Sequence, residues 1–446
     1  MTFAQINEPW IGEMPVEWRL TAIKRLVSIK VTDGPHETPE LTDDGVQFLS
    51  AEAIKNYQID FNLRRGFISR ELHDQYSRKC KPKRGDIFVI KSGATTGNVA
   101  YVDVDFEFSI WSPLALIRCD PRIAFYKFVY YVFLTDVFRK HAELSWSFGT
   151  QQNIGMGVIE RLKVPLPPRT EQQRIAAYLD ASCAAIDAAV AAKRRQLETL
   201  DALRKSTIKR AVTMGLNPSV KTQRTDVEWI PEMPQHWRLV RVKDVMEFFN
   251  TVRVPLSAAE RGVMTEKTYD YYGASGVIDQ VEAYLFDGTY ILIAEDGANL
   301  LTRSKPLAFL ATGKFWVNNH AHILKPRWGG DDTFFVNLLE LQDFSLFVTG
   351  AAQPKLTMDN LGRFKLAVPR VPEQKEIAAF IREKEAEFRP LFTQIERQIE
   401  TLVRYRKSLI HECVIGQRRV TEADLRRAGA ANGLPPAEPL AAGKKL

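Results

Sequence analysis

The chain has few cysteines, and those it has are far apart. Its 446 residues include four, namely Cys80, Cys119, Cys183 and Cys413. None of them forms a Cys-x-x-Cys pair, so the spacing predicts neither a zinc site nor a disulfide framework. Reduced thiols are typical of the cytoplasm, and we expect a cytoplasmic protein.

Long hydrophobic runs are also missing. The most apolar stretch, residues 125–138, is interrupted by Lys127 and Asp136, and no uninterrupted run reaches the roughly 18 residues expected of a membrane span. The N-terminal residues lack the basic region and apolar run of a secretory signal. The sequence therefore predicts no membrane partner.

The motifs of enzymes that act on DNA do not occur either. The segment 93–97 has neither the spacing nor the lysine of a phosphate-binding loop, and there is no Gly-x-Gly-x-x-Gly nucleotide turn. An aromatic-flanked Asn/Asp-Pro-Pro motif of the amino-methyltransferase type is absent too. We therefore predict a non-catalytic chain without a cofactor of its own.

Three short fragments resemble parts of catalytic or metal sites. His320 and His322 lie on one face of a predicted strand, but two imidazoles are too few for a metal, which favours a packed or hydrogen-bonded pair. Glu373-Gln-Lys375 resembles a nuclease Glu-x-Lys, yet its counterpart Glu171-Gln-Gln173 favours a repeated helix start. His411-Glu412 lacks the second histidine of a zinc protease helix and is predicted to face solvent or an interface. The fragments predict no catalytic residue and no metal site.

The composition is that of a soluble globular protein with a positive charge. Hydrophobic residues make up 45% and charged residues 26%, and the formal net charge is +7. A basic balance favours a polyanionic partner, although many proteins carry similar charge for solubility alone. A chain of this length predicts two or three domains.

Two sequence motifs occur twice, in the same order. Residues 10–20 (WIGEMPVEWRL) return at residues 229–239 (WIPEMPQHWRL), a shift of 219 positions. Residues 164–179 (VPLPPRTEQQRIAAYL) return at residues 366–381 (LAVPRVPEQKEIAAFI), a shift of 202 positions. The chain is therefore a tandem duplication of one unit.

The two halves differ between these repeated ends. A loose similarity aligns residues 85–95 (GDIFVIKSGAT) with residues 288–298 (GTYILIAEDGA). Both read as a short apolar strand that runs into a glycine turn. Similar motifs at both ends of each half, with different sequences between them, predict a common scaffold that carries two distinct recognition regions, which we call reading heads.

Each second motif opens a long amphipathic helix. Apolar residues recur at three-, four- and seven-residue steps from Ile175 to Ile208 and from Ile377 to Leu409. The pattern covers about 40 residues, or roughly 60 Å of helix. Two matching helices favour mutual packing in a coiled coil, whereas each could alternatively fold back onto its own domain. Pro390 is expected to kink or loosen the second helix.

Polar and basic residues at predicted loop positions are candidates for reading base edges. In the first half they are Lys91, Ser92, Thr95, Thr96, Asn98, Thr150, Gln151, Gln152 and Asn153. In the second half they are Asn299, Arg303, Asn318, Asn319, Gln353 and Lys355. Taken singly, each also fits a turn or a solvated position; as a set on both halves they favour DNA contact.

The first long helix adds a basic run that contains Lys193 and Arg194. Between Arg169 and Gly215, nine basic residues stand against five acidic ones. Such charge belongs either to a solvated face or to a surface that neutralises phosphates, and both interpretations stay open.

The chain resembles the specificity subunits of type I restriction–modification systems from about residue 8 to residue 415. Besides both helix openings, the stretches that carry the resemblance are 32–39 (TDGPHETP), 85–97 (GDIFVIKSGATTG), 272–278 (YGASGVI), 294–299 (AEDGAN), 313–322 (GKFWVNNHAH) and 353–356 (QPKL).

The resemblance implies two α/β target-recognition domains separated by two long antiparallel helices. It implies double-stranded DNA, two methyltransferase (modification) subunits and ATP-dependent restriction (translocase–nuclease) subunits as partners. S-adenosylmethionine, ATP and magnesium would belong to those partners. The target would consist of two short half-sites around a spacer of unspecified bases.

With the resemblance, the chain divides into six predicted segments. They are a first target-recognition domain (1–168), a central helix (169–215), a linker (216–226), a second target-recognition domain (227–370), a C-terminal helix (371–415) and a flexible tail (416–446). Other functions stay open: a specificity component of a methyltransferase–nuclease outside type I, a duplicated metal-dependent DNA endonuclease, and a coiled-coil scaffold without DNA contact.

Overall fold

The computed structural model describes residues 2–6, 11–143, 147–148, 152–350 and 353–431. The chain divides into two compact units: unit 1 contains residues 1–194 and 397–446, and unit 2 contains residues 195–396. The sequence predicts the long helices as segments of their own, but both unit boundaries fall inside these helices. Each unit therefore contains one sequence repeat and a portion of both helices.

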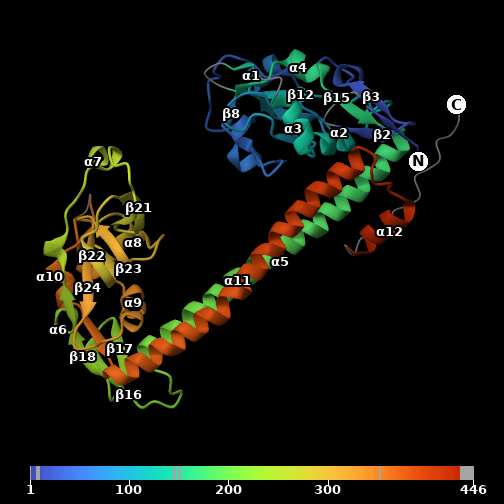
Figure 1. Ribbon diagram of the computed structural model, residues 1–446. Coiled ribbons are helices and arrows are strands. Elements are labelled where there is room, and N and C mark those ends of the chain that lie inside the picture. Colours follow the sequence, from blue (N-terminus) through green and yellow to red (C-terminus); the bar gives the residue numbers. More distant parts are fainter. Residues whose placement is uncertain (1, 7–10, 144–146, 149–151, 351–352, 432–446) are drawn as a thin grey trace. The chain divides into compact units, whose positions relative to one another are not determined.

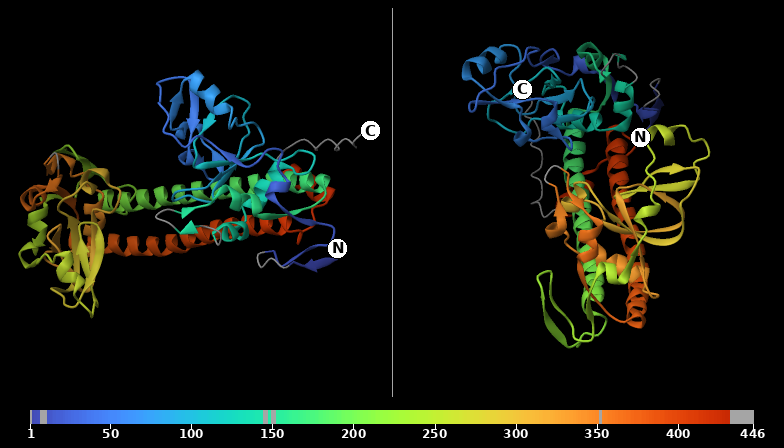
Figure 2. Two further views of the ribbon diagram at one scale, coloured as in Figure 1. Left: turned by 90° about the horizontal axis from the view of Figure 1, so that it is seen from above. Right: turned by 90° about the vertical axis from the view of Figure 1, so that its left-hand side faces the viewer.

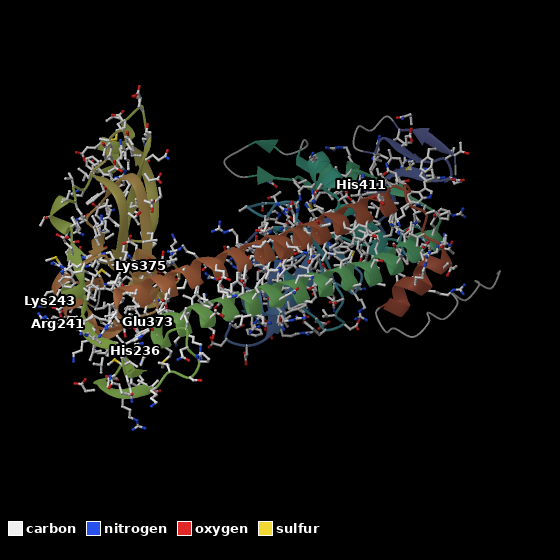
Figure 3. The ribbon with its side chains drawn as sticks, turned by 60° about the horizontal axis from the view of Figure 1, so that its bottom comes forward. His236, Arg241, Lys243, Glu373, Lys375 and His411 are labelled. Carbon is white, nitrogen blue, oxygen red and sulfur yellow. The ribbon has the colours of Figure 1, made fainter. Side chains whose placement is uncertain are left out.

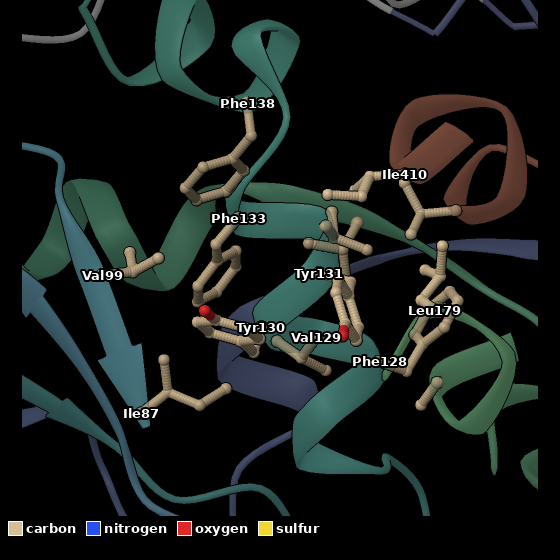
Figure 4. Packing of buried hydrophobic residues seen from close by; sticks show 14 of the residues in the cluster. Ile87, Val99, Phe128, Val129, Tyr130, Tyr131, Phe133, Phe138, Leu179 and Ile410 are labelled. Atoms are coloured by element: carbon tan, nitrogen blue, oxygen red, sulfur yellow. The ribbon is translucent and has the colours of Figure 1, made fainter. Parts of the chain in front are cut away.

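Unit 1 is built on a four-stranded antiparallel sheet. In order across the sheet, its strands are β10 (Val99–Tyr101), β9 (Ile87–Ile90), β12 (Leu114–Ile117) and β4 (Thr32–Asp33). Every residue of β9 and β12 is buried, which explains why these strands are continuously apolar in the sequence. One buried cluster joins this sheet through Ile87 and Val99 to Phe128 of helix α2 (Tyr126–Phe133) and to Leu179 (Figure 4).

Smaller elements complete unit 1. A three-stranded sheet has the order β11 (Ser109–Ile110), β5 (Val46–Leu49), β8 (Gly66–Ile68). The other elements are β1 (Phe3–Gln5), β2 (Glu13–Pro15), β6 (Ile54–Lys55), β7 (Gln58–Ile59), α1 (Arg70–Ser77), α3 (Asp136–Glu143), β13 (Ser147–Phe148), β14 (Gln152–Asn153) and α4 (Met156–Arg161).

Unit 2 contains a six-stranded sheet. In order across it, the strands are β19 (Met246–Phe248), β24 (Ala321–Pro326), β22 (Phe286–Ala294), β23 (Ala308–Val317), β20 (Tyr269–Gly273) and β21 (Gly276–Val281). Strands β19, β24, β22 and β23 repeat the order and the chain sequence of β4, β12, β9 and β10 in unit 1. The duplication therefore extends through the regions between the repeated motifs, where the sequences of the two halves differ.

The remaining elements of unit 2 are short. They are β16 (Thr222–Val227), β17 (Ile230–Pro234), α6 (Val242–Val245), α7 (Ala258–Gly262), α8 (Asn299–Thr302), α9 (Asp332–Glu340), β25 (Val348–Thr349), β26 (Lys355–Leu356) and α10 (Met358–Arg363).

The repeated motifs meet in space within each unit. In unit 1, β3 (Arg19–Ala22) pairs with β15 (Lys163–Leu166), and Leu20 lies opposite Pro165. In unit 2, β18 (Arg238–Arg241) pairs with β27 (Lys365–Val368), and Leu239 lies opposite Ala367. These are the positions that the two sequence shifts match, so the repeated ends form the same two-stranded frame twice.

Helices α5 (Arg169–Met214) and α11 (Val371–Val414) run side by side in opposite directions (Figure 1, Figure 2). In unit 1, Arg406 forms an ion pair with Asp187 at 3.1 Å; in unit 2, Arg204 pairs with Glu385 at 2.8 Å. Partner numbers fall along α11 as they rise along α5, which is antiparallel pairing. The predicted mutual packing is confirmed, and α11 continues through Pro390 without interruption.

Among the described helices, α5 is the one that is long and apolar enough to cross a membrane by length and composition. Its apolar residues Ile175, Leu179 and Ile186 are buried in the core of unit 1. Core helices of folded domains commonly have this composition.

Both long helices end at a glycine in the left-handed region. Gly215 has a φ of 75° and Gly416 a φ of 81°, as is usual where a helix stops. Gly215 lies against Trp237, and Gly416 lies against Trp18. The end of each helix therefore packs on a tryptophan of the repeated motif.

The structure corrects two predicted segments. The sequence predicts a flexible tail over residues 416–446, but helix α12 (Glu422–Ala431) lies within it, and its Leu425 packs against the core of unit 1. Its short, alanine-rich pattern is too weak a signal to separate a docked helix from a tail. The predicted linker 216–226 contains most of β16, which pairs with β17.

Candidate nucleic-acid interface

In unit 1, the predicted reading residues surround the end of strand β9. After Ile90 the chain turns at Gly93, whose φ is 99°. The Thr96 hydroxyl donates a hydrogen bond to the carbonyl of Gly93 at 2.6 Å, and the Gly97 amide donates to the carbonyl of Ile90 at 2.7 Å. These bonds close a tight loop over residues 91–98 and leave Thr95 exposed.

A second segment, distant in sequence, lies beside this loop. Asn153 forms a β-bridge with Ser92, and the amide of Ile154 donates to the carbonyl of Lys91 at 2.7 Å. The structure thus brings together two groups of candidates from separate parts of the chain. Thr150 and Gln151 lie outside the described residues, and only the backbone of Gln152 is described.

The Lys91 side chain is largely buried in an ion pair and does not extend into solvent. Its Nζ lies 2.5 Å from Oδ2 of Asp33, and its side chain is 12% exposed. Lys79 Nζ lies 2.6 Å from Oδ1 of Asp33, and His36 Nε2 lies 3.0 Å from Oδ2. We call these four residues the Asp33 cluster. Burial would raise the pKa of Asp33, but hydrogen bonds from Lys79 and Lys91 outweigh that effect and hold the pKa below its usual value.

Two further candidates of unit 1 also have structural roles. Thr96 is buried and forms the loop, and the Asn98 side chain accepts a hydrogen bond from Arg139 at 3.0 Å. Like Lys91, these residues shape the loop, and their assignment as DNA-binding residues stays a prediction. Ser92 is half-buried, and Thr95 and Asn153 are exposed.

Unit 2 has the same arrangement at the end of strand β22. The amide of Leu356 donates to the carbonyl of Glu295 at 2.7 Å, and Asp296 forms a β-bridge with Lys355. Gly297, with a φ of 101°, repeats the turn made at Gly93. Each unit therefore places a glycine turn beside a segment that enters a short helix.

The loose sequence alignment of the two loops is wrong by one position. It matches Ser92 with Glu295, whereas the bridges match Ser92 with Asp296. Gly85 precedes the four-residue strand β9, but Gly288 lies inside the nine-residue strand β22. Aligning these two glycines therefore shifts the register.

Glu295, the structural equivalent of Lys91, carries the opposite charge. Its Oε2 lies 2.6 Å from Nη1 of Arg253 and 3.5 Å from Nδ1 of His322, and its Oε1 lies 3.3 Å from Nζ of Lys355. We call these four residues the Glu295 cluster. Burial would raise the pKa of Glu295, but Arg253, His322 and Lys355 together outweigh that effect, and the pKa lies below its usual value.

The two histidines of the sequence HAH are hydrogen-bonded to protein groups. His322 is fully buried, with Nε2 2.7 Å from the carbonyl of Leu356 and Nδ1 2.7 Å from Nδ2 of Asn250. His320 Nδ1 lies 2.9 Å from Asp296. The predicted hydrogen-bonded pair is confirmed, and burial lowers the pKa of His322. In the described part of the chain, no group of three His, Cys, Asp or Glu residues is placed to hold a metal ion.

Three candidates of unit 2 form hydrogen bonds within the fold, and their assignment as DNA-binding residues stays a prediction. Asn299 and Arg303 bond with backbone groups of neighbouring segments. Asn318 is 6% exposed, and its side-chain oxygen accepts from the amide of His320 at 2.8 Å. The exposed candidates of unit 2 are Arg303, Asn319, Gln353 and Lys355.

Lys193 and Arg194 lie on α5 within unit 1, where Arg194 is exposed and Lys193 half-buried. Both interpretations of the basic run, a solvated face and a phosphate contact, are compatible with these positions.

Sequence reasoning missed three basic residues beside the loops, namely His36, Lys79 and Arg253. The stretch 32–39, which carries part of the family resemblance, was the available sequence signal for His36. In the structure its Gly34 has no room for a side chain, because a Cβ there would lie 1.9 Å from the carbonyl oxygen of Ile110. Lys79 and Arg253 come from segments without a motif, and only the folded chain brings them to the buried carboxylates.

The repeated Glu-Gln joins each long helix to its own unit. Gln172 is fully buried; its oxygen accepts from the N-cap amide of α2 at 2.7 Å, and its nitrogen donates to the carbonyl of Pro167 at 2.8 Å. Gln374 repeats this pattern with the N-cap amide of α9 and the carbonyl of Pro369. Glu373 accepts from the Trp237 indole at 3.1 Å and lies 2.9 Å from His236 (Figure 3). The interpretation of Glu373-Gln-Lys375 as a repeated helix start is confirmed.

Two α/β units that share a four-stranded sheet core, each with exposed polar loops and joined by paired antiparallel helices, define a duplicated recognition protein. A family model described as the type I restriction modification DNA specificity domain matches residues 15–199 and 234–401. The chain belongs to this family, whose members select DNA sequences within restriction–modification complexes.

Individual relatives cover different shares of the chain. The type I restriction enzyme MjaIX specificity subunit of Methanocaldococcus jannaschii is 20% identical over 94% of this chain and 97% of that protein. A Haemophilus influenzae protein assigned as a type I restriction enzyme specificity subunit is 30% identical, over 35% of this chain and only 37% of its own length. A chain from a solved structure of a type I restriction–modification system matches with a TM-score of 0.69 and 14% identity, over 91% of this chain and 99% of that one, which shows the shared fold.

Proposed function

We propose that this chain is the non-catalytic subunit that selects a bipartite DNA target, with each unit reading one half-site. The observation that carries the proposal is the duplicated loop arrangement with different exposed side chains. Unit 1 presents Thr95 and Asn153, and unit 2 presents Asn319 and Gln353. Different donors and acceptors on the same frame would pair with different base edges.

Exchanging one reading head at a time tests this division. Replacing residues 20–160 with the equivalent segment of a relative should change one half-site, and replacing residues 240–360 should change the other. The methylated sequences in cells that carry each chimaera give the readout. If one exchange altered both half-sites, the units would not read independently.

Single residues test the same point within a unit. Asn319→Ala should relax base choice in one half-site, because a lost base pairing costs about 1–3 kcal/mol of discrimination. Gln151→Ala, outside the described residues, remains a parallel prediction for the other half-site. Asn62→Ala, which removes an exposed asparagine of unit 1, is the matched control and should leave both half-sites unchanged.

We further propose two methyltransferase subunits and ATP-dependent restriction subunits as partners in the cytoplasm. S-adenosylmethionine, ATP and magnesium would belong to those partners. Support comes from the two repeats of the scaffold, each with its own helix start, and from four unpaired, buried cysteines that suit a reducing compartment. Native mass measurement should find two methyltransferases per chain; one at saturation would contradict the two-fold argument. Metal-dependent DNA cleavage by the purified chain would instead favour a duplicated endonuclease.

A further inference from the structure

In both units a carboxylate beside the exposed loop contacts more than one cation, although the loop sequences differ. In the Asp33 cluster, one buried carboxylate contacts two lysines and a histidine. In the Glu295 cluster, one carboxylate that is 12% exposed contacts an arginine, a lysine and a histidine. In each cluster, two full positive charges therefore stand against one negative charge before the histidine is counted.

The inner ion pair has opposite polarity in the two units. The residue after β9 is Lys91, and its partner Asp33 lies in the edge strand β4. The equivalent residue after β22 is Glu295, and its partner Arg253 follows the edge strand β19. The residue types are exchanged, yet the charge balance of the cluster is the same. The two units therefore share a carboxylate held between two cations, and not one particular pair of residue types.

Each cluster also has one lysine that reaches solvent. The side chain of Lys79 is 50% exposed and that of Lys355 is 51% exposed, whereas Lys91 and Arg253 are at most 14% exposed. A lysine ammonium has three N–H donors. Lys79 donates to Asp33 and, at 3.0 Å, to the carbonyl of Gly34, which leaves one donor for a ligand. The carboxylate thus holds the ammonium in place without neutralising the cluster.

We propose that Lys79 and Lys355 contact DNA phosphates, one in each unit, and that Asp33 and Glu295 hold them in position. The proposal rests on the proposed function, because base-reading loops need separate contacts that fix the protein on the duplex backbone. Phosphate fits this chemistry, since a compact ammonium contacts it as a point charge without base preference.

The test measures DNA binding by the chain assembled with its methyltransferase. Fluorescence anisotropy is recorded over a range of salt concentrations with two duplexes. One contains the sequence that the complex methylates, and the other has a random sequence. Lys79→Gln and Lys355→Gln remove the charge at similar length, and Lys79→Arg retains it. The matched controls are Lys83→Gln, an exposed lysine four residues before β9, and Lys243→Gln, an exposed lysine before β19.

Each Gln variant should weaken binding to both duplexes by the same factor and lower the slope of log affinity against log salt by about 0.9. Lys79→Arg and both controls should keep the wild-type slope. A loss confined to the target duplex would make the lysine a base reader, and an unchanged slope with a lower melting temperature would make it structural; either result overturns the proposal.

The same data separate this proposal from the proposed function. A wild-type complex that bound both duplexes equally would contradict target selection, while the salt slopes on the random duplex would still decide the role of the two lysines. A complex that bound neither duplex would overturn both.

Discussion

At the residue scale, the repeated glutamines Gln172 and Gln374 make equivalent hydrogen bonds in the two units. Each amide joins the first turn of a long helix to the start of a neighbouring helix through backbone hydrogen bonds. An apolar replacement would leave buried backbone groups without partners, which costs about 1–3 kcal/mol for each group. The repeat therefore preserves the attachment of a helix to its unit, not a catalytic pair.

Gln172→Leu should lower the free energy of unfolding by about 2–4 kcal/mol, because the side chain serves one amide and two carbonyls. Urea denaturation followed by circular dichroism measures the change. The neighbouring half-buried Gln173→Leu is the matched control, with a smaller expected effect. Equal losses in the two variants would argue against the hydrogen bonds as the cause.

Asp33 predicts a pH dependence of stability in unit 1. Because the pKa of the folded carboxyl lies below its usual value, its contribution is fully present above the ordinary aspartate pKa of about 4 and is lost as the pH falls through the lowered value. Asp33→Asn should remove this dependence and cost about 3–5 kcal/mol at neutral pH, because it leaves Lys91 buried without a counter-charge.

Denaturation at neutral and acidic pH, with Asp33→Asn alone and combined with Lys91→Met, checks this prediction. The double variant should recover part of the lost stability, since it removes the unpaired ammonium as well. A double variant that is as unstable as Asp33→Asn would show that the unpaired Lys91 ammonium is not the cause of the lost stability.

At the scale of elements, α11 shows that packing can override a local helix-breaking residue. Proline in a helix interior removes one backbone hydrogen bond and costs about 3 kcal/mol relative to alanine. The helix nevertheless runs from Val371 to Val414, and Phe388 and Ile395 on either side of Pro390 are buried. Burial of the neighbouring turns offsets the local cost.

Pro390→Ala should therefore raise the free energy of unfolding by about 1–3 kcal/mol, because alanine restores the missing donor. Chemical denaturation measures the change, and Glu383→Ala at an exposed position of the same helix should stay within about 0.5 kcal/mol of the parent. A destabilised Pro390→Ala variant would mean that a local distortion at the proline is needed for packing.

At the scale of the whole molecule, the paired helices connect the two recognition units, and we expect their length to set the DNA spacer. Inserting one heptad into each of α5 and α11 keeps the apolar seam and adds about 10 Å of helix. At 3.4 Å per base pair this is roughly three base pairs, less what tilt and bending absorb.

Sequencing the methylated sites of cells that carry the double heptad insertion should show a spacer longer by about one to three base pairs, with both half-sites unchanged. Inserting two residues in place of seven should break the seam and lower stability without creating a new target. An unaltered spacer after the heptad insertion would show that the helices do not determine the distance.

The sequence by itself determined the duplication, the family and the two long helices. The predicted helices, 169–215 and 371–415, differ from the observed ones by one residue at the C-terminal end. Helical periodicity repeats every few residues and needs no knowledge of distant segments, and a duplicated motif is visible without any fold. For the same reason the docked helix α12, which has a weak pattern of its own, escaped prediction.

Only the tertiary structure decided which polar residues near the loops face solvent and which hold the loops together. Lys91 and its partner Asp33 are 58 residues apart in sequence, and Arg253 and Glu295 are 42 apart. No local pattern encodes such a pair, because its geometry is set by strands that meet only in the folded sheet. Burial and long-range ion pairing therefore separated Lys91, Thr96 and Asn318 from the exposed Thr95, Asn319 and Lys355, which the sequence had shown as equivalent loop residues.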